Sequence, residues 1–231
     1  MIKILIILSR IGEVPALIVT IFSEAFSPQA LYGGLVGVLV TGVKRAAFSN
    51  EAGLGSAAFA HSAARTDEAA REGIVAMIGP FIDTIIICLM TALVCMITGA
   101  YTDPEFLGHG EFIVGAKMTA AAFESFIPGS RYVLAVAVLM FAYSTMISWS
   151  YYGERAWEYL FGGGSLLIFR LLFILFVWIG AVSQLANVIS FSDLMILSMA
   201  FPNIIGGIIL SPLIKEKLQE YWARLRRGEM R

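Results

Sequence analysis

Apolar stretches long enough to cross a lipid bilayer recur along this chain, separated by short clusters of charge, glycine and proline. A spanning helix needs about 20 such residues, because the hydrocarbon core is about 30 Å thick. The composition agrees, since 58% of the 231 residues are hydrophobic, 14% are charged and the mean hydropathy is +0.82. Soluble domains carry about 25% charged residues, so this chain has too little polar surface for water. We therefore predict an integral membrane protein.

Five spanning segments are predicted, and charged residues and glycines interrupt the first of them. The apolar residues Ile2 to Leu8 are too few to span, so we interpret them as the remnant of a membrane segment. The domain organisation expected is residues 1–30 as this remnant with an outer connection, 31–213 as the membrane unit and 214–231 as a basic tail. The predicted spans are residues 31–64, 73–100, 131–152, 166–185 and 188–214.

Lys and Arg outside the spans predict the orientation. The tail after residue 214 carries six of them, and alternating the five spans places four more on the same side. The acidic loop over residues 101–129, in which we expect an amphipathic helix over 111–126, then faces outward. We expect a multi-pass protein of the inner (plasma) membrane with a cytoplasmic C-terminus. The four further inner cations are Arg65, Arg71, Arg155 and Arg170.

Several classes of protein are excluded by what the chain lacks. A formal charge of -1 argues against a nucleic-acid partner, because phosphate backbones require a strong basic excess. No Ser/His/Asp set, cluster of metal ligands or nucleotide loop lies within the spans, so we do not predict an enzyme. Cys88 and Cys95 are about 10 Å apart on a helix, too far for a disulfide, and are expected to be small buried hydrophobic residues.

Polar residues interrupt the first predicted span at a depth where they are costly. The Lys-Arg pair at 44–45 is followed by Ser49, Asn50 and Glu51, and then by two glycines. We expect a discontinuous helix, unwound over residues 44–50, whose free carbonyls and amides bind a polar ligand. The N-terminus of the next half-helix would favour a carboxylate. Such a site suits an amino acid and a cation.

Two other interpretations of this segment stay open. Residues 31–43 could form an interfacial hairpin, with the Lys-Arg pair and the SNEAG motif in a cytoplasmic loop. Glu51 could also cap a helix, because an acid in the first turn complements the helix dipole.

The third predicted span carries hydroxyl side chains one helical turn apart. Ser144 with Ser148, and Thr145 with Trp149, are spaced i, i+4. Hydroxyls on a helix often bond back to a carbonyl of the preceding turn. They also supply the oxygen ligands that an alkali cation takes from a protein, and Trp149 would then wall a small pocket. The spacing leaves both interpretations open.

Isolated ionisable residues complete the list of candidates. Asp83 has no nearby basic partner in the sequence, and an ion path and a buried hydrogen-bond network both fit it. Asp193 is expected at the membrane interface, near the outer end of the last span. His61 and His109 are expected at a loop edge and in the outer loop.

A series of motifs, in order along the chain, resembles the alanine or glycine:cation symporter family, the sodium:alanine symporters. The SNEAG and SWSYYGE segments are the most specific of them. The resemblance implies an all-α polytopic membrane protein with a LeuT-like fold, of which this chain matches the C-terminal half, one five-helix inverted repeat of core helices 6 to 10. The motifs are IFSEAFSPQALYGG (21–34), GVKRAAFSNEAGLGSA (42–57), DTIIICLMTALV (83–94), FAYSTMISWSYYGE (141–154) and FPN (201–203).

Site residues follow from the resemblance by position. It implies that Phe48 and the backbone around it, with Ser49 and Asn50, contact substrate, and that Thr145 and Trp149 face them from another helix. The hydroxyl of Ser144, that of Thr145 and the carbonyl of Met140 would bind sodium. Ala46 departs from the family, which usually has glycine after the arginine.

The implied function is sodium-coupled symport of small neutral amino acids, alanine or glycine, by alternating access across the cytoplasmic membrane. Members of the family are about twice as long as this chain, so we expect an N-terminally truncated chain or partial sequence. Its partners would be the substrate, the bilayer and an N-terminal half supplying the rest of the site. The alternative is a non-transporting, pseudogene-like remnant of such a symporter.

Overall fold

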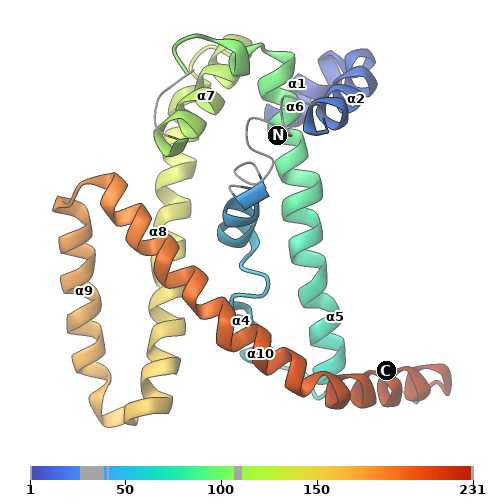
Figure 1. Cartoon of the computed structure of the whole chain (residues 1–231), viewed down its shortest axis with the longest axis vertical. Helices are drawn as coiled ribbons and strands as arrows, with labels where there is room; N and C mark the ends of the chain where they lie inside the picture. The colour runs from blue at the N-terminus through green and yellow to red at the C-terminus, as the bar shows by residue number, and fades with distance from the viewer. Residues whose placement is uncertain (1, 27–38, 41, 107–110, 230–231) are drawn as a thin grey trace. The chain divides into compact units, whose positions relative to one another are not determined.

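The computed structural model describes residues 2–26, 39–40, 42–106 and 111–229, whose regular elements are all helical (Figure 1). Four helices or helix series in this part of the chain are long and apolar enough to cross a membrane. They correspond to the last four predicted spans, so the all-helical architecture with several helices of spanning length is confirmed. Residues 31–38 and 41 of the predicted first span lie outside the described residues. The four candidates are Ala69–Ile97, Ser130–Phe161, Gly163–Val182 and Leu185–Arg226.

A further candidate lies at the N-terminus, where the sequence predicted only a remnant. Helix α1 (Ile2–Ser9) is followed by a 3₁₀ turn, η1 (Ile11–Glu13), and by α2 (Val14–Ala25). The two parts are bent by 73° and together are long and apolar enough for one broken span. The prediction counted only the short apolar stretch before Ser9 and overlooked the apolar helix that begins at Val14.

The chain forms two compact units, the first of residues 1–41 and 82–144 and the second of residues 42–81 and 145–231. In the first unit, α1 packs against α6 (Leu89–Ile97) and α7 (Glu111–Phe126). Lys3 donates a hydrogen bond from Nζ to the Thr91 hydroxyl at 2.7 Å. Cys95 is buried as predicted, whereas the expectation of burial was wrong for Cys88, which is exposed because it lies at the end of the π-helix before α6, the element that packs against α1 and α7. The buried core contains Ile6, Val94, Cys95, Ala100, Ala122 and Phe123.

The helix predicted over residues 111–126 is present as α7, and a carboxylate near its end caps the start of the next helix. Glu124 accepts hydrogen bonds from the backbone N–H of Gly129 at 2.9 Å and of Arg131 at 3.0 Å. These two bonds hold the pKa of Glu124 below its ordinary value, because they stabilise the charged form. Gly129 has a positive φ of 84°, so the turn between α7 and α8 (Ser130–Phe161) uses glycine where other residues would be strained.

In the second unit, the C-terminal part of α8 and α9 (Leu166–Val182) are joined by a tight turn, η4 (Gly163–Ser165). Trp157 donates from its indole N–H to the Ser165 hydroxyl at 2.9 Å. Arg170 binds Glu154 with two hydrogen bonds, of 2.7 and 3.2 Å. These contacts fix α8 and α9 as an antiparallel pair within this unit (Figure 1).

Proline shapes the helix that follows α4 (Ser56–Ser62). Helix α5 (Ala69–Pro80) continues as a π-helix, η2 (Phe81–Cys88), before α6. Pro80 has no N–H to donate and its ring crowds the preceding turn, which disturbs the regular hydrogen-bond ladder where the π-helix begins. The prediction treated this region as one span interrupted only by Pro80 and Asp83, and Asp83 lies in the first turn of the π-helix.

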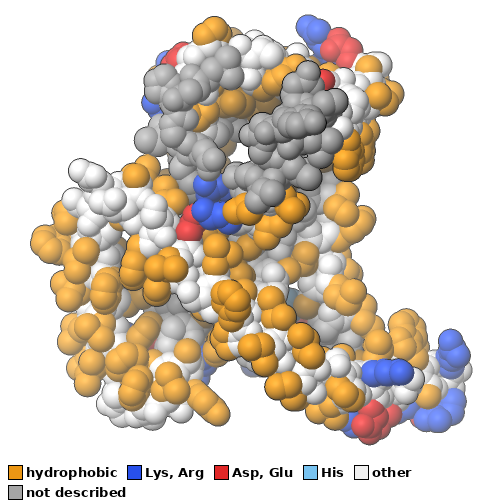
Figure 2. Space-filling model, viewed as in Figure 1, with side chains coloured by type: hydrophobic (Ala, Val, Ile, Leu, Met, Phe, Trp, Pro, Cys, Tyr) orange, Lys and Arg blue, Asp and Glu red, His pale blue; other side chains and the backbone are white. Residues whose placement is uncertain are grey.

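The last helix, α10 (Leu185–Arg226), is 42 residues long and extends beyond the predicted end of the span at residue 214. Along α8, α9 and α10, none of the residues in the most apolar windows is buried within the chain. Figure 2 accordingly shows hydrophobic side chains over much of the visible surface. Surfaces of this kind are unsuited to water and suited to lipid or to further protein segments.

Candidate functional site

The interrupted helix of the second unit is present, but it breaks later than predicted. Residues 42–50 are helical, and the break covers residues 51–55 before α4 begins. Left-handed backbone marks the break, with φ of 57° at Glu51, 82° at Gly53 and 102° at Gly55. The expectation of unwound backbone over 44–50 was therefore wrong. Glycine tolerates this conformation, whereas the residues from Lys44 to Asn50 are all compatible with a helix.

Local hydrogen bonds end the helix at Asn50. Its side-chain oxygen accepts the backbone N–H of Ala52 at 2.9 Å, and the N–H of Leu54 reaches the Glu51 carbonyl at 3.2 Å. An Asn side chain that binds the backbone two residues ahead replaces the next helical turn. Leu54, only 2% exposed, anchors the turn among its neighbours.

Helix α8 contributes Trp149 to this break. The indole N–H of Trp149 donates to the Glu51 carboxylate at 3.1 Å, across 98 residues of sequence. Both side chains are half-buried, and the ring of Tyr152 meets the Trp149 ring edge-on with centroids 5.9 Å apart. The predicted proximity of Trp149 to the interrupted helix is thus present. Its partner is Glu51, which the sequence offered only as a helix cap.

Helix α10 holds the same break from a second direction. The side-chain amide of Asn203 donates to the Gly53 carbonyl at 2.8 Å, so an otherwise free carbonyl of the break is satisfied. A methyl group at Gly55 would lie 3.4 Å from the Asn203 side chain. Asn203 was not predicted as a site residue. Its signal was the FPN motif, because Pro202 inside a helix marks a place where the backbone ladder is already incomplete.

An ion pair with a buried carboxylate joins the interrupted helix to α10. Lys44 donates from Nζ to Asp193 Oδ2 at 2.8 Å. Asp193 is only 7% exposed, and its other oxygen has no hydrogen-bond partner among the described residues. Its expected position at the membrane interface stays a prediction, to which the structure adds burial against Lys44. A lysine inside a span is costly, as the sequence indicated for Lys44, and the carboxylate of Asp193 on another helix offsets that cost.

The remaining predicted site residues lie a few residues before the helix break at 51–55 or before Trp149 in the sequence. Phe48 is half-buried and Ser49 is exposed on the helix that precedes the break, and Thr145 is exposed on α8 one turn before Trp149. Ser144 and Met140 belong to the first unit. The Ser144 hydroxyl donates to the Phe141 carbonyl at 2.9 Å, which is the backbone bond expected of a helical serine. Its oxygen keeps lone pairs that can accept a cation.

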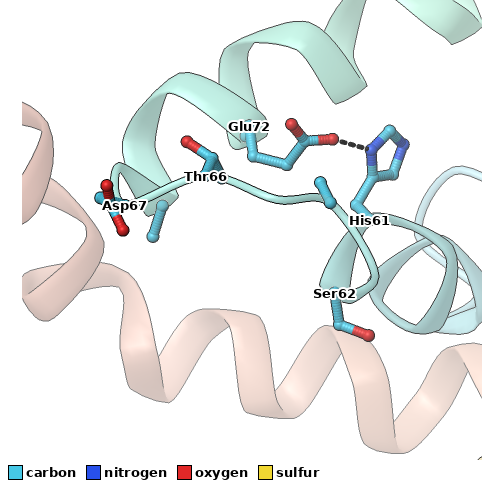
Figure 3. Close-up of a pocket in the computed structure, with 8 residues that line it drawn as sticks. His61, Ser62, Thr66, Asp67 and Glu72 are labelled. Carbon is cyan, nitrogen blue, oxygen red and sulfur yellow. Dashed lines mark hydrogen bonds and ion pairs between the residues drawn. The ribbon is translucent and has the colours of Figure 1, made fainter.

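Next to α4 the second unit has an open hollow of about 400 Å³ (Figure 3). His61, in the last turn of α4, binds the Glu72 carboxylate through Nδ1 at 2.6 Å. Thr66 and Asp67, from the connection to α5, line the hollow together with Ser62. The expected place of His61 at a loop edge is confirmed, and His109 lies outside the described residues. This polar hollow lies on the connection that follows α4.

The chain has sequence relatives that are named as transporters. A sodium/alanine symporter, AgcS, of Methanococcus maripaludis is 39% identical over 217 residues, which are 94% of this chain and 47% of that protein. An uncharacterized transporter of Haemophilus influenzae is 41% identical, over 97% of this chain and 49% of its own length. A putative sodium/proton-dependent alanine carrier protein, YrbD, of Bacillus subtilis is 29% identical, over 99% and 50%.

The chain thus spans about half the length of these relatives. The profile of the sodium:alanine symporter family matches residues 1–231, from the first residue to the last. The match therefore includes the interrupted helix, the candidate membrane spans and the motifs around Glu51 and Trp149. This chain belongs to the sodium:alanine symporter family.

Proposed function

We propose that this chain forms the C-terminal half of a symporter that carries small neutral amino acids, alanine or glycine, with sodium across the cytoplasmic membrane. The observation that carries the proposal is the helix break at residues 51–55, held by Trp149 of α8 and Asn203 of α10. A break of this kind is typical of transporter sites near the bilayer midplane. The relatives named as alanine symporters or carriers support the substrate class.

In this proposal the residues have distinct roles. Phe48 and the backbone at Ser49 and Asn50 contact the substrate, and Thr145 and Trp149 face it from α8. The hydroxyls of Ser144 and Thr145, with the Met140 carbonyl, bind sodium. Oxygen ligands of this type are those that a hard cation takes. The family description supports sodium, although one relative is named for sodium/proton dependence.

The proposed fold is a LeuT-like five-helix repeat, and transport would follow from alternating access around the break. Sodium binding would stabilise the substrate-competent state, and by linkage the substrate must raise sodium affinity by the same factor. The other half of the site would come from residues that correspond to the remaining half of the relatives.

A chimera tests the proposal. The N-terminal half of the Methanococcus maripaludis symporter is fused to this chain, and uptake of radiolabelled alanine is measured in vesicles with an inward sodium gradient. We expect uptake that requires sodium and disappears when choline replaces it. Uptake driven equally by a proton gradient would reassign the coupling ion. No uptake above empty vesicles, in a chimera that reaches the membrane and is monodisperse in detergent, would refute the proposal in favour of a non-transporting remnant.

A further inference from the structure

Helix α10 is too long for its whole length to lie within one membrane span. A 42-residue helix is about 63 Å long, about twice the thickness of the hydrocarbon core. Within the second unit, the last turns of α10 run crosswise to α5 (Figure 1). Pro212 lies inside the helix, and proline is a common cause of a kink. If α5 crosses the membrane, this end of α10 lies along its surface.

Contacts with other residues of the second unit hold this end of α10 in place. Arg224 donates to the Glu68 carboxylate at 2.6 Å, just before α5 begins. Tyr221, one turn earlier on a neighbouring face, is only 8% exposed. The end of the helix is therefore a docked element with a defined orientation.

Apolar side chains form a stripe beside the docked face. Leu218, Trp222 and Leu225 recur at i, i+4 and i+7, and they are 37%, 46% and 41% exposed. Figure 2 shows such hydrophobic side chains next to Lys and Arg along this end of the molecule. A half-exposed tryptophan with leucines on one helix face suits the boundary between acyl chains and headgroups.

Charges are distributed unevenly around the stripe. Lys215 and Arg226 lie on the flank that Trp222 occupies, since residues seven and four apart share a helix face. An open hollow of about 460 Å³ on this flank is lined by Gln219, Trp222, Ala223 and Arg226. The acids Glu216 and Glu220 point to the side opposite the apolar stripe, by the same spacing.

We propose that this flank of α10 binds the headgroups of anionic phospholipids, with Trp222 and the two leucines in the acyl boundary and Lys215 and Arg226 on the phosphates. The net positive flank, the amphipathic stripe and the crosswise course of the helix all fit a negatively charged membrane surface. Zwitterionic lipid would satisfy the stripe, but its phosphate is balanced by its own ammonium group, so it would attract the two cations less strongly. The inference depends on the membrane location of the chain and is independent of what the chain transports.

Quenching of tryptophan fluorescence by brominated lipids in nanodiscs tests the proposal with the full chain. The membrane is phosphatidylcholine with one-fifth phosphatidylglycerol, and bromine is placed on either the anionic lipid or an equal amount of phosphatidylcholine. The contribution of Trp222 is the difference from Trp222→Phe, because the chain has four tryptophans. We expect stronger quenching of Trp222 with bromine on the anionic lipid. The attraction of one cation to such a surface corresponds to an enrichment of anionic lipid around it by about fivefold.

Arg226→Gln should remove most of that preference. Arg227→Gln is the matched control, because it makes the same charge change one residue away, at an arginine bound to Glu229 by hydrogen bonds of 2.6 and 3.0 Å. Equal quenching by both lipids would overturn the selectivity for anionic lipid. An equal loss in both variants would overturn the defined site in favour of diffuse attraction. Absence of Trp222 quenching by either lipid would overturn the membrane contact and leave this face to a protein partner.

Discussion

The ion pair between Lys44 and Asp193 allows an asymmetric prediction about stability. Removing one partner of a buried pair costs about 3–5 kcal/mol, mostly because the other charge stays buried and uncompensated. The Asp193 side chain is 10% exposed and that of Lys44 is 34% exposed. Lys44→Met therefore leaves the more deeply buried charge and should cost about 3 kcal/mol. Asp193→Leu leaves an ammonium that water or headgroups can reach, so it should cost about 1 kcal/mol.

For a chain of this size, 1 kcal/mol shifts Tm by about 2–4 °C, so Lys44→Met should lower Tm by about 6–12 °C. The assay is thermal unfolding of detergent-solubilised protein, followed by the monodisperse fraction on size exclusion. The double variant Lys44→Met/Asp193→Leu should return to within about 1 kcal/mol of the parent, because it buries no charge. Arg155→Met is the control, since its pair with Glu158 is 42% and 39% exposed and should contribute about 0–1 kcal/mol. Equal losses in the two single variants, or no recovery in the double variant, would refute the reasoning.

Four further predictions concern the helix break and helix α7. In the uptake chimera, Trp149→Ala should enlarge the pocket and shift preference towards bulkier side chains, and unchanged competition by leucine would show that Trp149 is not a wall of the site. Glu51→Gln keeps an acceptor for the indole N–H, whereas Glu51→Leu loses it and should cost about 1–3 kcal/mol in thermal unfolding; equal effects of the two would contradict the hydrogen bond at 3.1 Å. Gly55→Ala should destabilise the protein by about 1–2 kcal/mol, because the φ of residue 55 is 102°. The control Gly207→Ala, in a helix with open space around it, should be neutral or stabilising. The same Tm for both variants would contradict the left-handed break. The lowered pKa of Glu124 means that its bonds to two backbone amides stabilise the turn above the ordinary carboxyl pKa and are lost as pH falls through the lowered value. The protection of these two amides against hydrogen exchange, relative to the intrinsic rate at each pH, should therefore fall in acid, and in Glu124→Gln that acid-dependent loss should be absent.

The candidate spans and helix α7 could be predicted because length and hydropathy are local properties of the chain. The same local reasoning failed where proline and glycine set the backbone. It placed the helix break over residues 44–50, although the left-handed residues lie at 51–55, where Gly53 and Gly55 stand in the sequence. It also did not predict that the helix continues beyond the span end at residue 214 as far as Arg226.

The partners across the fold could not be read from the chain. Lys44 was predicted to be costly inside a span, but nothing in the sequence connects it with Asp193, 149 residues later. Trp149 was singled out as a pocket wall, whereas Glu51 as its acceptor and Asn203 as the partner of Gly53 were missed. The substrate and sodium roles of Phe48, Ser144 and Thr145 stay predictions.

The sequence by itself determined the membrane class, the positions of four spanning helices and the family, because apolar length and specific motifs are written in consecutive residues. Only the tertiary structure decided how the helix break is held, with an indole from α8, an amide from α10 and a buried carboxylate opposite Lys44. Polar groups removed from water must find partners, and which distant helix supplies them depends on how the helices pack.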